Sequence, residues 1–365
     1  MDALLLLSSV PYSMTRSSLT PNPSPGGRGE RRVRIGLSSN TERSIVGVPE
    51  NCRLGGPAFQ RLHQAHPRVQ VRIVHDQAEF SRQVTQADAV IGSRPYLKLS
   101  AEAAKPGARL RWVQTTTVGV DQAVPPDLLA AEHVTLTCIK GPPGPLMAEH
   151  AVLLMLALSR NLPVYLKNQQ LHLWRREGQD WLPLHGQTTA ILGVGSGGGN
   201  LARICKIGFG MTVLGMTRTP REIPHLDRAF DKSGLLSVLP EADFVVLCLP
   251  HTPETRLIIN AAAFDAMKPT ACLINVSRGA LIDEEALIAA MRAGRIAGAG
   301  LDVTTADPIP RESPLWDLPN TIITPHIATE SVKMSDAVVD FWCENLRRFA
   351  ENQPLLGVVD RRAGY

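Results

Sequence analysis

The sequence lacks a strong excess of charge of either sign. Its 38 Lys and Arg residues against 34 Asp and Glu residues leave a formal net charge of +4 on 365 residues. Proteins that bind nucleic acid or acidic membranes need concentrated basic surface, so the charge favours neither as a partner. The apolar fraction of 44% and the charged fraction of 20% are those of a globular protein with room for two domains.

Closely spaced cysteines are also lacking. The six cysteines lie far apart and no two form a CxxC pair; they are Cys52, Cys138, Cys205, Cys248, Cys272 and Cys343. This spacing gives no zinc motif and no disulfide framework, so we expect no metal site and buried free thiols. Free thiols are typical of a reducing compartment, and we expect a cytoplasmic protein.

The sequence also shows no pattern typical of a targeting signal or of a membrane-spanning helix. The short apolar run at residues 4–7 follows Asp2 instead of basic residues, and no small-residue cleavage site comes after it. Residues 148–158 are strongly apolar but fall short of the ~20 residues that a spanning helix needs, so we expect a buried helix there. Residues 15–32 are rich in Pro, Gly, Ser and Arg, and we expect residues 1–32 to form a disordered tail.

Short apolar runs alternate with helical stretches through the rest of the chain. The first series has expected strands at 33–37, 69–74, 89–91, 110–113 and 134–137, and the breaker at 141–145 is a plausible domain crossing. The second series has expected strands at 190–192, 212–216, 244–249, 271–276, 298–303 and 322–324, and a last helix is expected at about 336–350. This alternation predicts an α/β fold with two doubly wound parallel sheets.

A glycine-rich motif follows the first strand of the second series. Gly193, Gly195 and Gly198 match G-x-G-x-x-G between an expected strand and an expected helix at 201–206. The glycines allow a tight turn, close approach of a pyrophosphate and close helix–strand packing, while the helix N-terminus holds the phosphates. A glycine-rich turn without a ligand is the alternative, but the strand–turn–helix context favours dinucleotide binding.

The end of the next strand indicates which dinucleotide is bound. An Asp or Glu at that place binds the ribose 2′-hydroxyl of NAD, whereas an Arg accommodates the 2′-phosphate of NADP. This chain has Thr217 and Arg218 there and no carboxylate. Arg218 can be an ordinary surface arginine, but we favour NADP(H) over NAD(H) because its guanidinium would make a charge-assisted contact to the phosphate.

Three polar residues lie at expected strand ends in the second series, where α/β sheets bind ligands. Arg278 can grip a substrate carboxylate and polarise a neighbouring carbonyl. His326 can protonate a developing alkoxide, because histidine titrates near neutral pH. Asp307 is the candidate carboxylate that orients the imidazole. Each residue alone has a structural explanation, but the three together predict a catalytic site for reducing a small 2-oxo acid.

These motifs, taken in order, resemble those of the D-isomer-specific 2-hydroxyacid dehydrogenases. The likeness runs from about residue 33 to residue 365 and is carried by LGVG at 192–195, CLPHTPET at 248–255, NVSRGAL at 275–281, GLDV at 300–303 and PHIA at 325–328. Residues 206–211 resemble the glyoxylate/hydroxypyruvate reductase branch, which is often linked to NADP(H).

The resemblance implies a fold, a set of roles and an assembly. It implies a Rossmann cofactor domain at 145–328 and a discontinuous, flavodoxin-like substrate domain at 33–144 and 329–365, in a homodimer built around the cofactor domain. It implies that Asp302 bonds the nicotinamide carboxamide, that Val118 and Gly119 bind the substrate carboxylate together with Arg278 and His326, and that 249–255 lines the adenosine side. The residues expected at the cofactor are Gly193, Gly195, Ser196, Gly197, Gly198, Thr217, Arg218, Leu249, Pro250, Thr255, Val276, Ser277 and Asp302.

One departure from the family pattern is the Asp at position 307, where the family usually has Glu. The shorter side chain predicts a stretched or water-bridged contact with His326, or a backbone shift that compensates for it. It also leaves open a catalytically weak NAD(P)-sensing protein of the same fold. Formate dehydrogenase, which resembles this branch but carries Gln at that position, and phosphoglycerate dehydrogenase with an appended regulatory domain are disfavoured.

Overall fold

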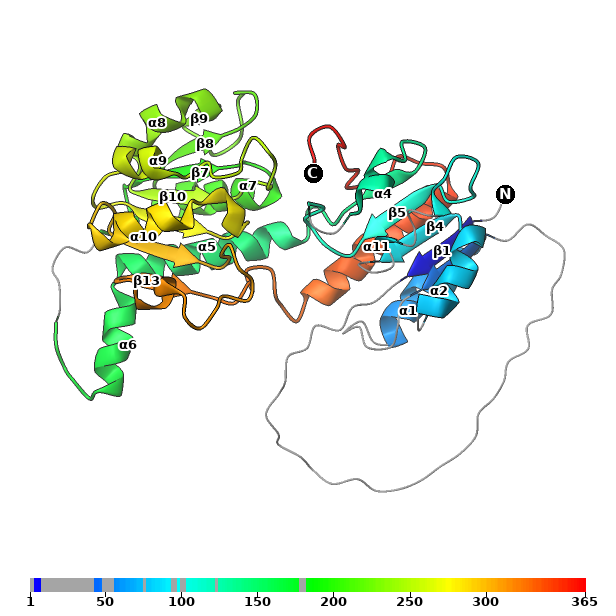
Figure 1. Ribbon diagram of the computed structural model, residues 1–365, viewed down its shortest axis with the longest axis horizontal. Coiled ribbons are helices and arrows are strands. Elements are labelled where there is room, and N and C mark those ends of the chain that lie inside the picture. The colour runs from blue at the N-terminus through cyan, green and yellow to red at the C-terminus, as the bar shows by residue number, and fades with distance from the viewer. Residues whose placement is uncertain are drawn as a thin grey trace, which may run out of the picture. The chain divides into compact units, whose positions relative to one another are not determined.

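The computed structural model describes residues 3–7, 43–47, 56–74, 77–92, 97–98, 103–121, 124–176 and 182–365. The chain divides into two compact units (Figure 1). Unit 1 comprises Met1–Thr117, Gln122–Cys138 and Val339–Val358, and unit 2 comprises Val118–Asp121, Ile139–Val338 and Val359–Tyr365. The division differs from the expected domains at both ends of the cofactor domain, since unit 2 resumes at 139 instead of 145 and the last segment of unit 1 begins at 339 instead of 329. Residues 118–121 and 359–365, both expected in the substrate domain, also fall in unit 2.

Unit 1 is built on a parallel sheet with helices packed against it. Its described strands follow the order β1-β3-β2-β4-β5-β6, and they are β1 (Ala3–Leu7), β2 (Arg43–Gly47), β3 (Val69–Ile73), β4 (Ala89–Gly92), β5 (Trp112–Thr115) and β6 (Thr135–Thr137). Its helices are α1 (Gly56–Gln64), α2 (Gln77–Gln83), the short 3-10 helix η1 (Val84–Gln86), α4 (Pro126–Ala130) and the later part of α11 (Met334–Ala350).

Strand β1 corrects one expectation, since residues 3–7 pair with β3 in parallel instead of belonging to a tail. A short run of consecutive apolar residues is also the pattern of a strand in a parallel sheet. The expected first strand at 33–37 and the rest of the expected tail lie outside the described residues.

A buried polar network joins the C-terminal segment of unit 1 to its sheet. Trp112 donates from its indole nitrogen to Thr137 Oγ1 at 2.8 Å, and Thr137 donates to Gln114 Oε1 at 2.7 Å. Asn345 of α11 donates to the same Gln114 oxygen at 3.0 Å and accepts from the Leu356 amide at 2.7 Å. Because each of these buried polar side chains has a partner, the network fixes α11 against β5 and β6.

Unit 2 contains a seven-stranded parallel sheet in the described part of the chain, in the order β13-β12-β11-β10-β7-β8-β9. The strands are β7 (Thr188–Leu192), β8 (Thr212–Met216), β9 (Arg228–Phe230), β10 (Phe244–Leu247), β11 (Cys272–Asn275), β12 (Gly298–Leu301) and β13 (Thr321–Ile323). The helices are α5 (Pro143–Ser159), α6 (Leu162–Gln170), α7 (Ser196–Arg203), α8 (Leu235–Val238), α9 (Ala261–Ala266) and α10 (Glu284–Arg292). Short helical turns η2 (Ile204–Gly208), η3 (Lys232–Gly234), η4 (Leu239–Glu241), η5 (Gly279–Leu281) and η6 (Pro314–Asp317) complete the unit.

Hydrophobic clusters cover both faces of this sheet. Alternate residues of β7 point to opposite sides, so Ala190 and Leu192 join a cluster with α8, α9 and α10, while Ile191 joins a cluster with α5 and α7. Both faces of a parallel sheet are buried in this way, which is why its strands are apolar throughout. The α/β architecture expected from the sequence is confirmed.

The winding of the sheet reverses at β7. The chain runs from β7 to β8 and β9 on one side, then crosses to β10 on the other side of β7. The loops after β7 and β10 therefore leave the sheet in opposite directions, and the crevice between them is the ligand site of open α/β sheets. No helix in the described part of the chain is both long enough and apolar enough to cross a membrane.

Candidate functional site

The glycine-rich turn after β7 has the geometry that a dinucleotide phosphate needs. Gly193 has a φ of 102°, and a Cβ at this position would lie 2.6 Å from the carbonyl oxygen of Cys248. A Cβ on Gly198 would lie 2.0 Å from the carbonyl oxygen of Gly193, so the helix packs directly on the turn. A Cβ on Gly195 would meet no atom within 4 Å, which leaves its backbone open on the ligand side.

Helix α7 begins without a side-chain cap at Gly195. Its first N–H groups have no partner within the helix and point out of its N-terminus, where the helix dipole favours negative charge. The backbone at this turn therefore fits a pyrophosphate. Ser196 donates its hydroxyl to the carbonyl oxygen of Gly141 at 3.1 Å, and a Cβ on Gly197 would lie 2.1 Å from Met147 Cε, so close packing against α5 explains the glycine at 197.

Thr217 and Arg218 follow β8 as expected. Thr217 donates its hydroxyl to the Thr219 carbonyl at 3.0 Å, which closes the turn. The Arg218 side chain is 62% exposed and donates to the hydroxyl of Tyr365 at 2.8 Å. A cation therefore lies at the strand end where the second phosphate of NADP is bound in dinucleotide folds.

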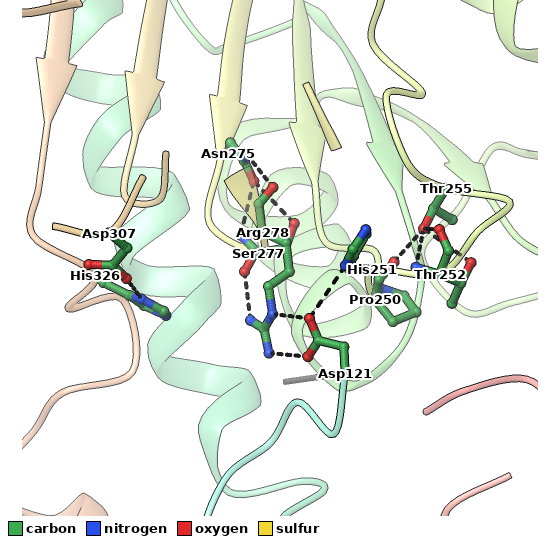
Figure 2. A network of polar contacts seen from close by, with 10 residues as sticks. All are labelled: Asp121, Pro250, His251, Thr252, Thr255, Asn275, Ser277, Arg278, Asp307 and His326. Atoms are coloured by element: carbon green, nitrogen blue, oxygen red, sulfur yellow. Dashed lines mark hydrogen bonds and ion pairs between the residues drawn. The ribbon is translucent and has the colours of Figure 1, made fainter. Parts of the chain in front are cut away.

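The segment after β10 is a turn held by its own side chains (Figure 2). Thr255 donates its hydroxyl to the Pro250 carbonyl at 2.7 Å, and the Thr252 amide donates to Thr255 Oγ1 at 2.8 Å. Leu249 is half-buried and packs on the core. Thr255 thus fixes the shape of the expected adenosine side of the site.

Arg278 stands directly after β11, at a strand end locked by Asn275. The buried Asn275 side chain donates to the Arg278 carbonyl at 2.8 Å and accepts from the amide and the hydroxyl of Ser277, both at 3.1 Å. The Arg278 guanidinium donates to the Ser277 carbonyl at 2.7 Å and lies 3.4 Å from the Asp121 carboxylate. Val276 is buried in the core at 4% exposure, between Asn275 and Ser277.

Asp121 was not expected from the sequence to lie at Arg278, and His251 was expected only as part of 249–255 on the adenosine side. The Asp121 carboxylate, 13% exposed, lies between Arg278 and His251, whose Nδ1 is 3.6 Å away (Figure 2). A Cβ on Gly119 would lie 1.6 Å from Arg278 Nη2, so the loop from Val118 to Asp121 packs on the guanidinium. The loop expected at the substrate carboxylate therefore does reach Arg278, and its carboxylate occupies part of the arginine's donor edge.

His326 and Asp307 are joined directly, with 2.6 Å between Nδ1 and Oδ2. This distance is that of a direct contact, so the expectation of a stretched or water-bridged contact is wrong. His326 has a φ of 55°, and the loop that carries Asp307 is held by a hydrogen bond from the Thr305 amide to Glu284. Left-handed backbone at a non-glycine residue is costly and is found preferentially at functional sites.

Asp302 is buried beneath His326 and organises its loop. The carboxylate accepts from Thr324 Oγ1 at 2.6 Å and from the amides of Ile327 and Ala328, both at 2.9 Å, and its own carbonyl accepts from the His326 amide at 2.9 Å. Burial alone would raise the pKa of Asp302, but hydrogen bonds from His150, Thr324 and the two amides outweigh it and lower the pKa. Asp302 is therefore an ionised anchor, and His150 is a further residue that the sequence did not indicate.

The described residues also bear on two other kinds of site, metal centres and reactive thiols. No group of His, Cys, Asp and Glu side chains in the described ranges could hold a metal ion. The five described cysteines are free thiols, and burial raises the pKa of Cys205, Cys248 and Cys272 to about 12, so these thiols are poor nucleophiles at neutral pH.

A family model, sequence relatives and solved structures all indicate the same protein family. The model of the NAD-binding domain of D-isomer specific 2-hydroxyacid dehydrogenases matches residues 152–328. The chain is 33% identical to a glyoxylate reductase of Thermococcus onnurineus over 329 residues, which cover 86% of this chain and 94% of that protein. It is 37% identical to a glyoxylate reductase of Pyrococcus furiosus over 213 residues, which cover 56% of this chain and 63% of that protein.

Two solved structures share the fold over most of the chain. A D-isomer specific 2-hydroxyacid dehydrogenase from Xanthobacter autotrophicus, in complex with NADPH and MES, has a TM-score of 0.72 and 30% identity over 84% of this chain and 95% of its own. An NADPH-dependent glyoxylate/hydroxypyruvate reductase from Sinorhizobium meliloti, in complex with NADP and sulfate, has a TM-score of 0.72 and 29% identity over 84% of this chain and 96% of its own.

Proposed function

Because this chain belongs to the D-isomer specific 2-hydroxyacid dehydrogenase family, we propose that it reduces a small 2-oxo acid such as glyoxylate or hydroxypyruvate with NADPH. The observation that carries the proposal is the direct hydrogen bond between His326 and Asp307, at the same sheet edge as Arg278. A histidine oriented by a carboxylate beside an arginine is what protonating a carbonyl next to a carboxylate requires.

Arg278 holds the substrate. Its planar guanidinium binds the carboxylate and polarises the adjacent carbonyl through fixed N–H donors. The backbone of Val118 and Gly119 belongs to the loop that packs on this guanidinium, which supports a role for that loop at the substrate carboxylate. Asp121 keeps the guanidinium oriented before substrate arrives, since it is the ion partner of Arg278 within the unit.

His326 supplies the proton. When the imidazole is protonated, Nδ1 donates to Asp307 and Nε2 carries the second proton toward the substrate oxygen. A reduced nicotinamide, when bound, would supply the hydride for the carbonyl carbon, and this hydride with the proton from His326 would convert the 2-oxo acid to the 2-hydroxy acid. Asp307 stabilises the imidazolium and fixes the direction of the ring.

The chain's own residues that would hold the cofactor lie along the crevice at the winding reversal. The backbone from Gly195 to Gly198 would take the pyrophosphate, the turn from Leu249 to Thr255 would line the adenosine side, and Asp302 would lie at the carboxamide. We place the 2′-phosphate at Arg218, which makes NADP(H) the preferred cofactor. Complexes of two structural relatives with NADPH and NADP support this assignment.

We also propose a cytoplasmic homodimer. The free thiols fit a reducing compartment. A set of large apolar side chains on α5, α6 and the residues just after α6 is exposed to between 37% and 58%, namely Leu153, Leu156, Leu162, Leu166 and Leu171. A cluster of exposed leucines in the cofactor unit is what a second copy of the chain would cover.

The experiment that tests the function is the initial rate of NADPH and NADH oxidation with glyoxylate and with hydroxypyruvate. We expect turnover with both acids and a preference for NADPH. Arg278→Ala should lower kcat/KM by about a thousandfold while the Kd for NADPH stays nearly unchanged. Tight dinucleotide binding without turnover of either acid would contradict the reductase and favour the NAD(P)-sensing alternative.

A further inference from the structure

Residues 359–365 form a closed turn in the same unit as the cofactor crevice. Asp360 Oδ1 accepts from the amides of Arg362 and Ala363, both at 3.0 Å, and the Gly364 amide donates to the Asp360 carbonyl at 2.8 Å. The Asp360 amide donates to the Tyr365 carbonyl at 3.0 Å, which closes the turn from the other end. The segment therefore presents Tyr365 on a backbone that is already fixed.

Tyr365 contacts Arg218 at two points. The phenol hydroxyl accepts from Arg218 Nη2 at 2.8 Å, and the guanidinium carbon lies 5.2 Å from the ring centroid. A single contact would leave this long, mostly exposed side chain free to rotate, but a hydrogen bond and a cation–π contact together fix the direction of its planar fork.

The contact with Tyr365 does not neutralise the positive charge of Arg218. A phenol is neutral, and it takes one of the five N–H donors of a guanidinium. The Asp360 carboxylate is 4.0 Å from Arg218 Nη1, but both side chains are more than half exposed, so their attraction is weak and screened. The Glu254 carboxylate, which is fully exposed, also attracts Arg218 electrostatically. A phosphate dianion, with more charge and three acceptor oxygens, would compete well with these exposed carboxylates. Lys140 Nζ lies 6.0 Å from the same ring centroid and adds positive charge nearby.

We propose that Tyr365 is a positioning residue that holds Arg218 ready for the 2′-phosphate of the adenosine ribose, so that residues 359–365 help set the preference for NADP(H). This inference rests on the proposed placement of the 2′-phosphate at Arg218. Its physical basis is preorganisation: an arginine that is ordered before the ligand arrives loses less conformational freedom on binding.

The test is isothermal titration calorimetry of the full chain with two fragments that differ only in the 2′-phosphate, adenosine 2′,5′-bisphosphate and adenosine 5′-monophosphate. Tyr365→Ala should weaken binding of the bisphosphate about tenfold and leave the monophosphate unchanged, and Tyr365→Phe should weaken it about threefold by removing the hydroxyl alone. Arg218→Ala should abolish the preference for the bisphosphate, and Tyr365→Ala should have no further effect in that background. Arg228→Ala is the matched charge control, because it removes an arginine of β9 that is paired with Glu241. It should change the affinity for neither the bisphosphate nor the monophosphate.

The outcomes separate the inference from the proposed function. If Arg218→Ala abolishes the preference but Tyr365→Ala does not change it, the positioning role is wrong and the phosphate site stands. If Tyr365→Ala weakens both fragments equally, or tightens the bisphosphate, the inference is overturned, because Tyr365 then acts on the whole nucleotide or competes with the phosphate. If Arg218→Ala leaves the preference intact, both the inference and the placement of the 2′-phosphate fail.

Discussion

At the scale of single residues, the contact between Asp307 and His326 decides how the imidazole of His326, the proposed acid, is oriented. The Oδ2 to Nδ1 distance of 2.6 Å is that of a direct, charge-assisted hydrogen bond. The aspartate side chain is therefore long enough to reach the ring without a bridging water.

Two substitutions at 307 separate charge from length. Asp307→Asn should lower kcat about a hundredfold, because the amide cannot stabilise the imidazolium. Asp307→Glu should keep most of the activity, because the carboxylate is retained and its loop is exposed enough to adjust. The measurement is kcat and kcat/KM for 2-oxo acid reduction across the pH range, with the Kd for NADPH as the control. Equal activity of Asp307→Asn and the unmodified chain would contradict the pairing.

Local sequence patterns indicated the site residues that follow directly after a strand. They did not indicate residues whose contacts are with segments far away in the sequence. Arg278, Asp307 and His326 were predicted because each follows an apolar strand, and parallel strands end at one edge. The contacts of Asp121 with Arg278 and His251 were missed, since nothing near position 121 indicates them. His150 was read only as part of an apolar helix, although its Nε2 lies 2.9 Å from Thr324 Oγ1. Such contacts arise from tertiary packing, which local patterns do not encode.

At the scale of the elements, Asp302 ties three of them together. Its carboxylate joins the end of β12 to the loop after β13, and His150 of α5 lies 3.4 Å from the same carboxylate. The lowered pKa means that the folded state holds the proton on Asp302 less tightly than the unfolded chain does. This contribution to stability is complete above the ordinary aspartate range and is lost as the pH falls through the lowered folded-state pKa.

Asp302→Asn should therefore destabilise the protein by about 1–3 kcal/mol at neutral pH, since an amide N–H would face other donors in a buried place. The difference between the variant and the unmodified chain should shrink as the pH falls through the acid range. Urea unfolding at a series of pH values measures both effects. A difference that grows toward acid pH would contradict the assigned ionisation.

A second prediction for the elements concerns two glycines of α7, Gly198 and Gly199. Gly198→Ala should destabilise the turn by about 1–3 kcal/mol and weaken NADPH binding, because the new Cβ would lie 2.0 Å from a backbone oxygen that cannot move aside. Gly199→Ala, whose Cβ meets nothing within 4 Å, is the matched control and should raise stability by about 0.5–1 kcal/mol. Thermal unfolding and NADPH titration check both. Equal effects at the two positions would contradict the packing described for this turn.

The element pattern of unit 2 was largely predictable and its exceptions have local causes. The ends of six of its strands were expected to within two residues. Helix α10 begins after Asp283, which accepts from the Ala286 amide at 3.1 Å and so caps the helix. Strand β9 was missed because its three residues include an exposed arginine and form no apolar run. Helix α7 begins earlier than expected, at Ser196, because consecutive glycines hide a helix start from propensity.

At the scale of the whole molecule, the chain crosses between its units more than once. Helix α11 starts in unit 2 and ends in unit 1, and residues 359–365 return to unit 2. A discontinuous arrangement was expected only from the family resemblance. The points of crossing could not be predicted from the sequence, because a continuous helical pattern at 334–350 gives no sign of a unit boundary within it.

The exposed leucines of α5 and α6 make a prediction about assembly. Leu166→Glu should shift the proposed dimer toward monomer in sedimentation velocity, because a buried unpaired charge is costly at an interface. Leu236→Glu on α8 is the matched control, since Leu236 is 52% exposed and Leu166 is 50% exposed. If neither variant changes the sedimentation coefficient, α6 is not part of the interface.

The four tryptophans that the structure describes differ in exposure between the units. Trp112 and Trp342 in unit 1 are 0% and 2% exposed, whereas Trp174 and Trp316 in unit 2 are 98% and 50% exposed. A buried indole emits at shorter wavelength than a hydrated one, so among these four tryptophans the two that emit at the blue edge of the fluorescence lie in unit 1. Denaturation followed at that edge therefore reports the melting of the expected substrate domain, while far-UV circular dichroism follows both units, and any separation of the two curves measures how independently the units unfold.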